Sequence, residues 1–140
     1  MDIQKQIQEL SDRLKRLEHG QYMPAAPAQH TPTEAGWVDD PTFDCTYIKV
    51  GKLVHLWYQI VGTSNAAAHT ITLPSGGTIG HGAQYCYVFH RAKEGAAWSY
   101  GVTEANTAAT TIRFYKDAAA TEYAATGTLD IYGYVCYWEA

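Results

Sequence analysis

Histidine has the widest catalytic range of the residue types in this chain, because it binds metals and transfers protons near neutral pH. The six histidines are His19, His30, His55, His69, His81 and His90. They contain no HExxH motif and no pair at the spacing typical of metal ligands. His55 and His69 fall on predicted strands and could meet across a sheet, which leaves one candidate pair open. The sequence therefore predicts no metal site and no cofactor.

Paired carboxylates and glycine-rich loops are the other patterns that would indicate catalysis. Asp39, Asp40 and Asp44 precede or open a predicted strand, where capping of a turn explains them better than acid catalysis. The glycines at positions 76, 77 and 80 have no following helix that would bind a phosphate. A glycan depolymerase would need a pair of acids that this sequence does not offer. The sequence thus predicts a protein that is not an enzyme.

Aromatic residues are unusually frequent, with eleven Tyr and four Trp. Most are expected in the core or at a subunit interface, because aromatic side chains dominate both. A flat apolar ring with a polar group also suits the face of a pyranose, so aromatic residues near turns are candidates for sugar binding. These candidates are Trp98, Tyr100, Tyr115 and Tyr123.

The three cysteines, Cys45, Cys86 and Cys136, form no pair at a metal-ligand spacing. All three fall inside predicted strands beside aromatic and aliphatic residues, where a free cysteine behaves as a small buried hydrophobe. One disulfide stays open as an alternative, while three reduced thiols in a protein made in the cytosol are the simpler interpretation.

Composition limits the chain to one compact domain, because it has 140 residues and is 46% hydrophobic. The net charge is −4, and the Lys and Arg residues are scattered, which argues against nucleic acid as a ligand. No apolar run approaches the ~18 residues that indicate a membrane span, so no membrane insertion is expected. Asp2, Lys5 and Glu9 interrupt any apolar core of a signal peptide.

The N-terminus carries an apolar stripe at alternating spacings of four and three residues, formed by Ile3, Ile7, Leu10, Leu14 and Leu17. This period is typical of a short coiled coil, with Ile7 and Leu14 at a positions and the others at d positions. The stripe is narrow, since polar residues flank it. The pattern predicts a seam between parallel copies of the chain, although packing of the stripe on its own domain stays open.

Three segments follow from these patterns. The helix is expected over residues 1–20 and ends at Gly20, which has easy access to left-handed backbone angles. Pro24, Pro27 and Pro32 lie in residues 21–35, which are predicted to form a semi-rigid neck. The β domain is expected over residues 36–140.

Seven strands are predicted in this domain, over residues 42–50, 53–61, 69–73, 85–91, 98–103, 110–115 and 129–138. Gly51 and Lys52 separate the first two strands and fit a type II′ hairpin turn. In the second strand, Val54, Leu56, Tyr58 and Ile60 share one face and are the candidate core. The last strand is apolar or aromatic on both faces, which indicates an outer face that meets a neighbouring subunit. The predicted fold class is mainly β, an antiparallel jelly-roll-type sandwich after a short N-terminal coiled-coil helix.

Residues 36–74 also carry a recognisable motif, Gly-Trp followed by TYIKVGKLVHLWYQIVGTSNAAAHTITLP. It resembles a domain found at the C-termini of tailed-bacteriophage virion proteins, in which a Tyr-x-Lys-x-Gly-Lys-Leu-Val hairpin leads to an Ile-x-Gly-Thr-Ser-Asn turn and a Thr-Ile-x-Leu-Pro strand end. The match is close from residue 37 to about residue 73 and loose over the final GTLDIYGYVCYW, whereas residues 81–123 depart from it. The matching positions look structural: Tyr47, Lys49, Gly51, Lys52, Leu53, Thr63 and Pro74.

The resemblance implies a trimeric jelly roll of the tumour-necrosis-factor type that follows a coiled coil or fibrous shaft. The expected function is a homotrimeric fibre or head decoration of a virion, made in the host cytoplasm. With no long shaft or separate anchor domain in the chain, the N-terminal helix is expected to attach to other virion proteins of the capsid, neck or tail. The alternative is a host-attachment knob that binds carbohydrate on the host surface.

Overall fold

The computed structural model describes residues 2–18, 26–66, 68–80 and 85–140. These residues form one α-helix, one 3₁₀ turn and nine strands. Their bounds are α1 (Ile3–Glu18), β1 (Ala28–Gln29), β2 (Glu34–Ala35), β3 (Trp37–Val50), β4 (Leu53–Ser64), β5 (His69–Thr72), the 3₁₀ turn η1 (Pro74–Gly76), β6 (Tyr85–Glu94), β7 (Ala97–Asn106), β8 (Thr111–Tyr115) and β9 (Thr128–Trp138). The mainly β prediction is confirmed, and all seven predicted strands are present.

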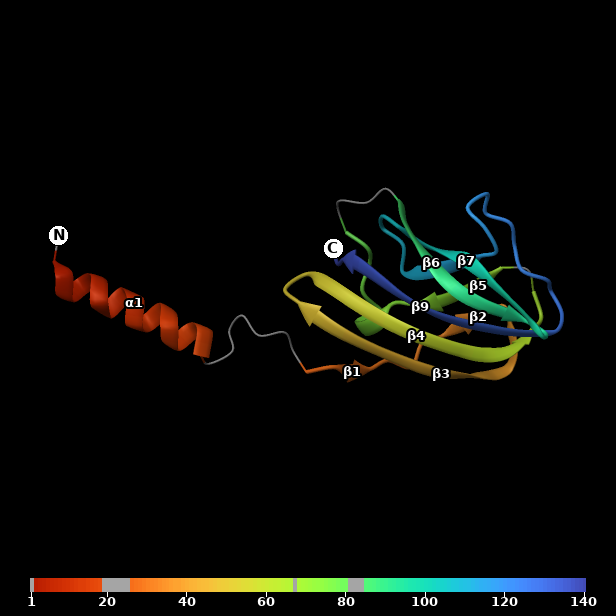
Figure 1. Cartoon of the computed structure of the whole chain (residues 1–140), viewed down its shortest axis with the longest axis horizontal. Coiled ribbons are helices and arrows are strands. Elements are labelled where there is room, and N and C mark those ends of the chain that lie inside the picture. The colour runs from red at the N-terminus through yellow and green to blue at the C-terminus, as the bar shows by residue number, and fades with distance from the viewer. Residues whose placement is uncertain (1, 19–25, 67, 81–84) are drawn as a thin grey trace.

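The helix α1 begins where the sequence predicts it. The Asp2 carboxylate accepts a hydrogen bond of 3.0 Å from the backbone N–H of Gln4, which caps the first turn. In Figure 1, α1 lies apart from the sheet. Its apolar stripe is exposed at Ile3, Ile7, Leu10 and Leu14, whereas the side chain of Leu17 lies outside the described set. The helix is therefore confirmed, and its association with other copies stays a prediction.

The nine strands form one antiparallel sheet in the order β1-β3-β4-β9-β6-β7-β8-β5-β2. β1 and β2 are neighbours in sequence yet lie at opposite ends of this order, so the sheet curls until its two edges approach each other (Figure 1). His30 joins the edges, because its backbone N–H donates to the Cys45 carbonyl while its ring Nε2 lies 2.8 Å from the Thr72 carbonyl oxygen.

The predicted neck is shorter than the sequence suggested. Residues 28–29 and 34–35 pair with β3 and β5, and Pro32 between them is buried. The sheet therefore begins before the expected boundary at residue 36. Strands of two residues carry no periodic signal, which explains why the sequence did not reveal them. Residues 21–25 of the neck lie outside the described residues.

The β3–β4 hairpin is confirmed. Val50 pairs with Leu53, Gly51 has φ of 60°, and Lys52 is not among the residues with positive φ. A positive φ at the first turn position alone is the mark of a type II′ turn, which glycine adopts at little cost. Asp44 lies within β3 opposite Gln59, so its predicted role as a turn cap is wrong. The side chains of Asp39 and Asp40 are outside the described set.

The core lies inside the curled sheet and follows the predicted alternation. On β4 the buried side chains are Val54, Leu56, Tyr58 and Ile60, and on β9 they are Leu129, Ile131, Val135 and Tyr137. Both strands are long and central, so each presents a row of apolar side chains to the interior, which on β9 is interrupted by Gly133. We call this side of the sheet the inner face and the opposite side the outer face.

Candidate functional site

His90 lies at the centre of a buried polar cluster on the inner face. Its Nδ1 is 3.0 Å from Oγ1 of Thr103, and its Nε2 is 2.6 Å from the hydroxyl of Tyr123. The Tyr58 hydroxyl shares a further hydrogen bond with the same Thr103 hydroxyl. His90 is 2% exposed and Thr103 is fully buried. Three hydrogen bonds thus link the four side chains inside the domain.

Burial keeps this cluster uncharged. It lowers the pKa of His90 to about 4 and raises the pKa values of Tyr58 and Tyr123 well above their usual range. At neutral pH the imidazole is therefore neutral and both phenols are protonated. A neutral group with hydrogen-bonded partners and no access to solvent holds the core together and is not placed to exchange protons with a substrate.

The polar cluster occupies space that is free because residues 101 and 133 are glycines without a Cβ atom. A Cβ on Gly101 would collide with the Tyr123 hydroxyl, the His90 ring and the backbone carbonyl of Tyr115. A Cβ on Gly133 would collide with the hydroxyl of Tyr58 and would lie 2.9 Å from Cβ of His90. The absence of both side chains is thus a packing requirement of the polar cluster.

Ser64 and His69 form a pair that looks like a nucleophile and its base, since Oγ of Ser64 is 2.9 Å from Nε2 of His69. The positions of the protons argue against that role. The single hydroxyl proton of Ser64 is donated to the Ala124 carbonyl at 2.6 Å, so the hydroxyl can only accept from His69. His69 Nε2 must then carry the proton and cannot remove one from Ser64. Both side chains are buried, which makes the pair structural.

The pair left open by the sequence, His55 with His69, has separate partners. Nδ1 of His55 lies 2.6 Å from the Tyr134 hydroxyl on the outer face, whereas His69 is fully buried beside Trp37, at a ring distance of 4.7 Å. Within the described residues no three His, Cys, Asp or Glu side chains are grouped as metal ligands would be. His19 and His81 are outside that set.

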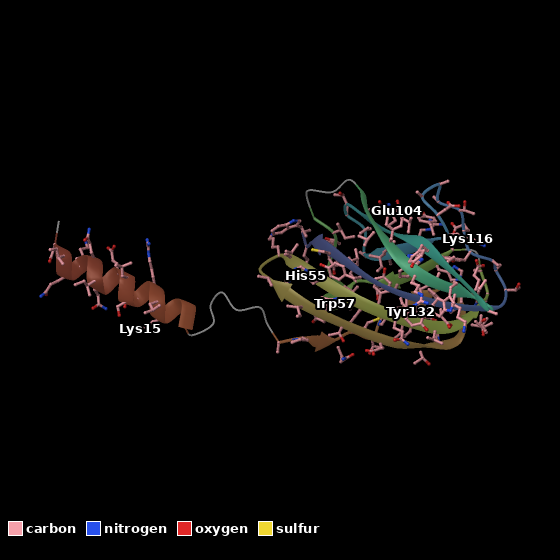
Figure 2. The ribbon with its side chains drawn as sticks, in the orientation of Figure 1. Lys15, His55, Trp57, Glu104, Lys116 and Tyr132 are labelled. Carbon is pink, nitrogen blue, oxygen red and sulfur yellow. The ribbon has the colours of Figure 1, made fainter. Side chains whose placement is uncertain are left out.

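Two clusters of accessible aromatic residues lie on the outer face. The first joins β4 to β9 and lies at the end of these strands nearer α1, where Figure 2 labels His55 and Trp57. Trp57 is the cross-strand partner of Tyr134, with ring centroids 5.2 Å apart, and the His55 ring stacks on Tyr134 at 6.0 Å. Trp57 is 44% exposed. Trp138, on the same strand as Tyr134, is exposed as well.

The second cluster joins β9, β6 and β7 and contains two cations. The guanidinium carbon of Arg91 lies 3.8 Å from the centroid of the Trp98 ring, and the Lys93 ammonium lies 5.6 Å from it. The Tyr132 ring is 5.8 Å from Trp98 and tilted by 43°. Tyr100 is paired with Arg91 across the strands and is 75% exposed. This arrangement presents flat rings and positive charge to solvent.

Two of the four predicted sugar-binding residues are exposed and two are buried. Trp98 and Tyr100 are exposed on the outer face, but Tyr115 and Tyr123 are buried, so their predicted accessibility is wrong. Tyr123 comes from a loop, yet its ring enters the interior and binds His90. Tyr115 is held at the end of β8 opposite Val102. Proximity to a turn does not determine the direction in which a side chain points.

The sequence analysis missed Arg91 and Tyr132. Tyr132 lies on β9 and Arg91 lies on β6, two residues from Lys93. The missing information is the register, which pairs Arg91 with Tyr132 on one side and Tyr100 on the other.

The cysteines partly answer the open question about pairing. In the described part of the chain, neither Cys45, which is buried, nor Cys136, which is half-buried, forms a disulfide. Burial raises the pKa of the Cys45 thiol to about 11. The side chain of Cys86 is outside the described set.

Comparison with known proteins identified no relative: no protein-family model, no curated protein and no solved structure matches the chain. Among the described residues, no helix has the length and apolar character needed to cross a membrane.

Proposed function

We propose that this chain is a non-enzymatic structural protein of a tailed-phage virion. In this proposal it is a homotrimeric fibre or head decoration with a jelly-roll-type β domain. Its helices form a parallel bundle and dock on a capsid, neck or tail protein, and the β domains point outward. The phage assignment and the number three come from the sequence resemblance, whereas the need for partners comes from the helix itself.

The exposed stripe of α1 is the observation that supports association with partners. Ile3, Ile7, Leu10 and Leu14 are 70%, 61%, 64% and 56% exposed within a single chain. A helix of 16 residues with an uncovered apolar seam is only marginally stable in water. Burying the seam against copies of itself removes it from solvent and stabilises the helix, as in a coiled coil.

The arrangement in space supports a division between attachment and display. α1 lies apart from the sheet in Figure 1, and Figure 2 places Lys15 on the same helix, away from the labelled residues of the β domain. A bundle of such helices would carry the β domains together at one end. It would leave its other end free to bind a different virion protein.

Light scattering of the full chain tests the assembly. A trimer gives a mass of three times 15.5 kDa. Replacing Ile7 and Leu10 by Gln removes the seam and is expected to lower this mass while the near-ultraviolet circular dichroism of the β domain stays unchanged. The matched control replaces Lys5 and Lys15 by Gln on the polar side of the helix, and it should keep the trimer. A monomeric wild-type chain at micromolar concentration contradicts the proposal.

Incorporation into particles tests the docking step. Because β1 and β2 belong to the sheet, removing residues 1–35 would also damage the β domain. Removing residues 1–20 is the cleaner change, and it is expected to abolish incorporation while leaving a folded β domain. Incorporation at the normal level by this truncated chain would show that attachment does not require the helix.

A second candidate function, binding of host-surface glycan, is favoured by the exposure of Trp98 and Tyr100. Both follow the turn from β6 to β7, at the end of these strands away from α1 (Figure 1). Exposed rings at this position suit a receptor-binding knob. Replacing Trp98 by Ala should then lower binding of host cells without lowering Tm, because a half-exposed ring contributes little to the core.

A further inference from the structure

We infer that Arg91, Trp98 and Tyr132 form a binding site for a sugar that carries a carboxylate, such as a uronic or sialic acid. The inference deepens the second candidate function and rests on it, since it specifies which class of glycan the outer face would bind. It is independent of the helix seam.

The geometry of Arg91 leaves its hydrogen-bond donors available. Its guanidinium lies 3.8 Å from the centroid of the Trp98 ring, so one flat face of the cation is used in a cation–π contact. The N–H groups of a guanidinium point outward in its own plane. They therefore remain free to bind a carboxylate through two parallel hydrogen bonds.

No carboxylate is paired with Arg91 among the described residues. The ion pairs among the described residues are Lys49 with Glu139, Arg113 with Glu122 and Lys116 with Glu94. Arg91 and Lys93 have no carboxylate within ion-pair distance in this part of the chain, although Asp130 is the cross-strand neighbour of Lys93. An exposed cation held rigid on an aromatic ring is prepared to bind an anion.

The same surroundings favour a ligand with a single charge. Asp130 offsets part of the positive charge, and the whole chain carries a net charge of −4. Long-range attraction of a polyanion is therefore absent, and selectivity must come from contact with Arg91. The rings of Trp98 and Tyr132 add apolar area for the C–H face of a pyranose. A carboxylated monosaccharide unit satisfies both requirements.

The site is open, so we expect weak binding by each copy. Several copies held together bind a repeated glycan more tightly than one copy, because the second contact is intramolecular. A weak single site is thus compatible with attachment to a polysaccharide surface.

The test uses the full chain labelled with 5-fluorotryptophan and two matched probes, methyl β-glucuronide and methyl β-glucoside. These sugars differ only in the carboxylate that replaces the hydroxymethyl group. Fluorine NMR resolves the four tryptophans separately, and buried Trp37 serves as an internal reference. The Trp98 signal is expected to shift and saturate with glucuronide, with an affinity about fivefold to tenfold higher than for glucoside.

Variants assign the preference to Arg91. Arg91→Gln should bind the two sugars equally, whereas Lys116→Gln, which removes a cation already paired with Glu94, should keep the preference. Equal affinity of the wild-type chain for both sugars overturns the inference and leaves glycan binding intact. Shifts confined to Trp57 or Trp138 overturn the location. No shift with either sugar, in a chain that is still trimeric by light scattering, overturns the site while the assembly proposal stands.

Discussion

Aromatic residues lie on both faces of the sheet, but they are buried on the inner face and accessible to solvent on the outer face. On the inner face Tyr58 is 3% exposed and its hydroxyl is bound to Thr103. Its neighbour Trp57, one residue earlier on the same strand, is 44% exposed on the outer face. Both are large aromatic residues in one strand, and only the side of the pleat differs.

The difference lies in how the polar atoms are used. Inside, the hydroxyls of Tyr58 and Tyr123 and the ring of His90 are bound within one closed cluster, which fixes the packing of strands far apart in sequence. Outside, the Trp57 ring packs beside His55 and Tyr134 and the Trp98 ring packs beside Tyr132 and two cations, yet both Trp residues keep accessible surface. The inner aromatic residues therefore determine the fold, and the outer ones are available for partners.

The largest expected effect concerns Gly101, which lies against the inner cluster. Gly101→Ala places a methyl group against the Tyr123 hydroxyl, the His90 ring and the Tyr115 carbonyl. Backbone and a hydrogen-bonded ring cannot yield easily, so we expect a loss of more than about 3 kcal/mol in the free energy of unfolding. Chemical denaturation followed by tyrosine and tryptophan fluorescence measures this loss.

Gly95 provides the matched control for that change. It lies in the β6–β7 turn with φ of 56°, and a Cβ there would meet nothing within 4 Å. Gly95→Ala should cost only the left-handed backbone strain, about 1 kcal/mol. Equal losses for the two variants would mean that Gly101 acts through its backbone and not through the cluster.

Adjacent residues on β4 give the most direct comparison of the faces. Leu56 is fully buried, so Leu56→Ala should lower the free energy of unfolding by about 2 to 5 kcal/mol through the cavity it leaves. Trp57→Ala removes a larger side chain but should cost under about 1 kcal/mol, because nearly half of that ring is already in solvent. If Trp57→Ala costs as much as Leu56→Ala in the isolated chain, the outer face is part of the core.

Acid should weaken the inner face through His90. The pKa of His90 falls from 6.5 to about 4 on folding. Between pH 6.5 and pH 4, His90 is therefore protonated in the unfolded chain and neutral in the folded chain. Stability is therefore fully present above pH 6.5 and is lost as the pH falls toward 4. Between pH 7 and pH 5 the expected loss from this residue is roughly 2 kcal/mol, measured by urea denaturation at each pH.

His90→Gln separates this effect from the titration of surface carboxylates. Glutamine has no proton to bind in this range, so the variant should be less stable than wild type at pH 7 but should lose less as the pH falls. The difference in the free energy of unfolding between wild type and His90→Gln is expected to be roughly 2 kcal/mol smaller at pH 5 than at pH 7. A constant gap would show that His90 is not the residue responsible.

Much of the sheet could be predicted from local patterns, because they depend on neighbouring residues. The β3–β4 turn required only Gly51 at the right spacing, and the alternation along β4 assigned Leu56 and Tyr58 to the interior. The strands β1 and β2 could not be predicted, since two residues have no period and their partners are distant along the chain.

The candidate site was predictable only in part, for the same physical reason. Trp98 and Tyr100 were found because they lie near a turn and are aromatic. Tyr123 was misplaced because its direction is decided by His90, 33 residues earlier, and Arg91 was missed because its contact with Trp98 depends on the register of β6 and β7. Pairing between strands is information that a single sequence does not show.

The smallest effect involves thiol reactivity, without a change in stability. Cys45 is buried on the inner face with a pKa raised to about 11, whereas Cys136 is half-buried on β9 opposite His55. Thiolate is the reactive form, so Cys45 should resist Ellman's reagent at pH 8 in the folded protein and react only on unfolding.

Chains with a single cysteine at 45 or at 136, and serine at the other two positions, allow each rate to be measured alone. The inner thiol should be slower by at least about a hundredfold, because burial suppresses both ionisation and access. Equal reaction rates for the two thiols would mean that solvent reaches the inner face as readily as the outer face.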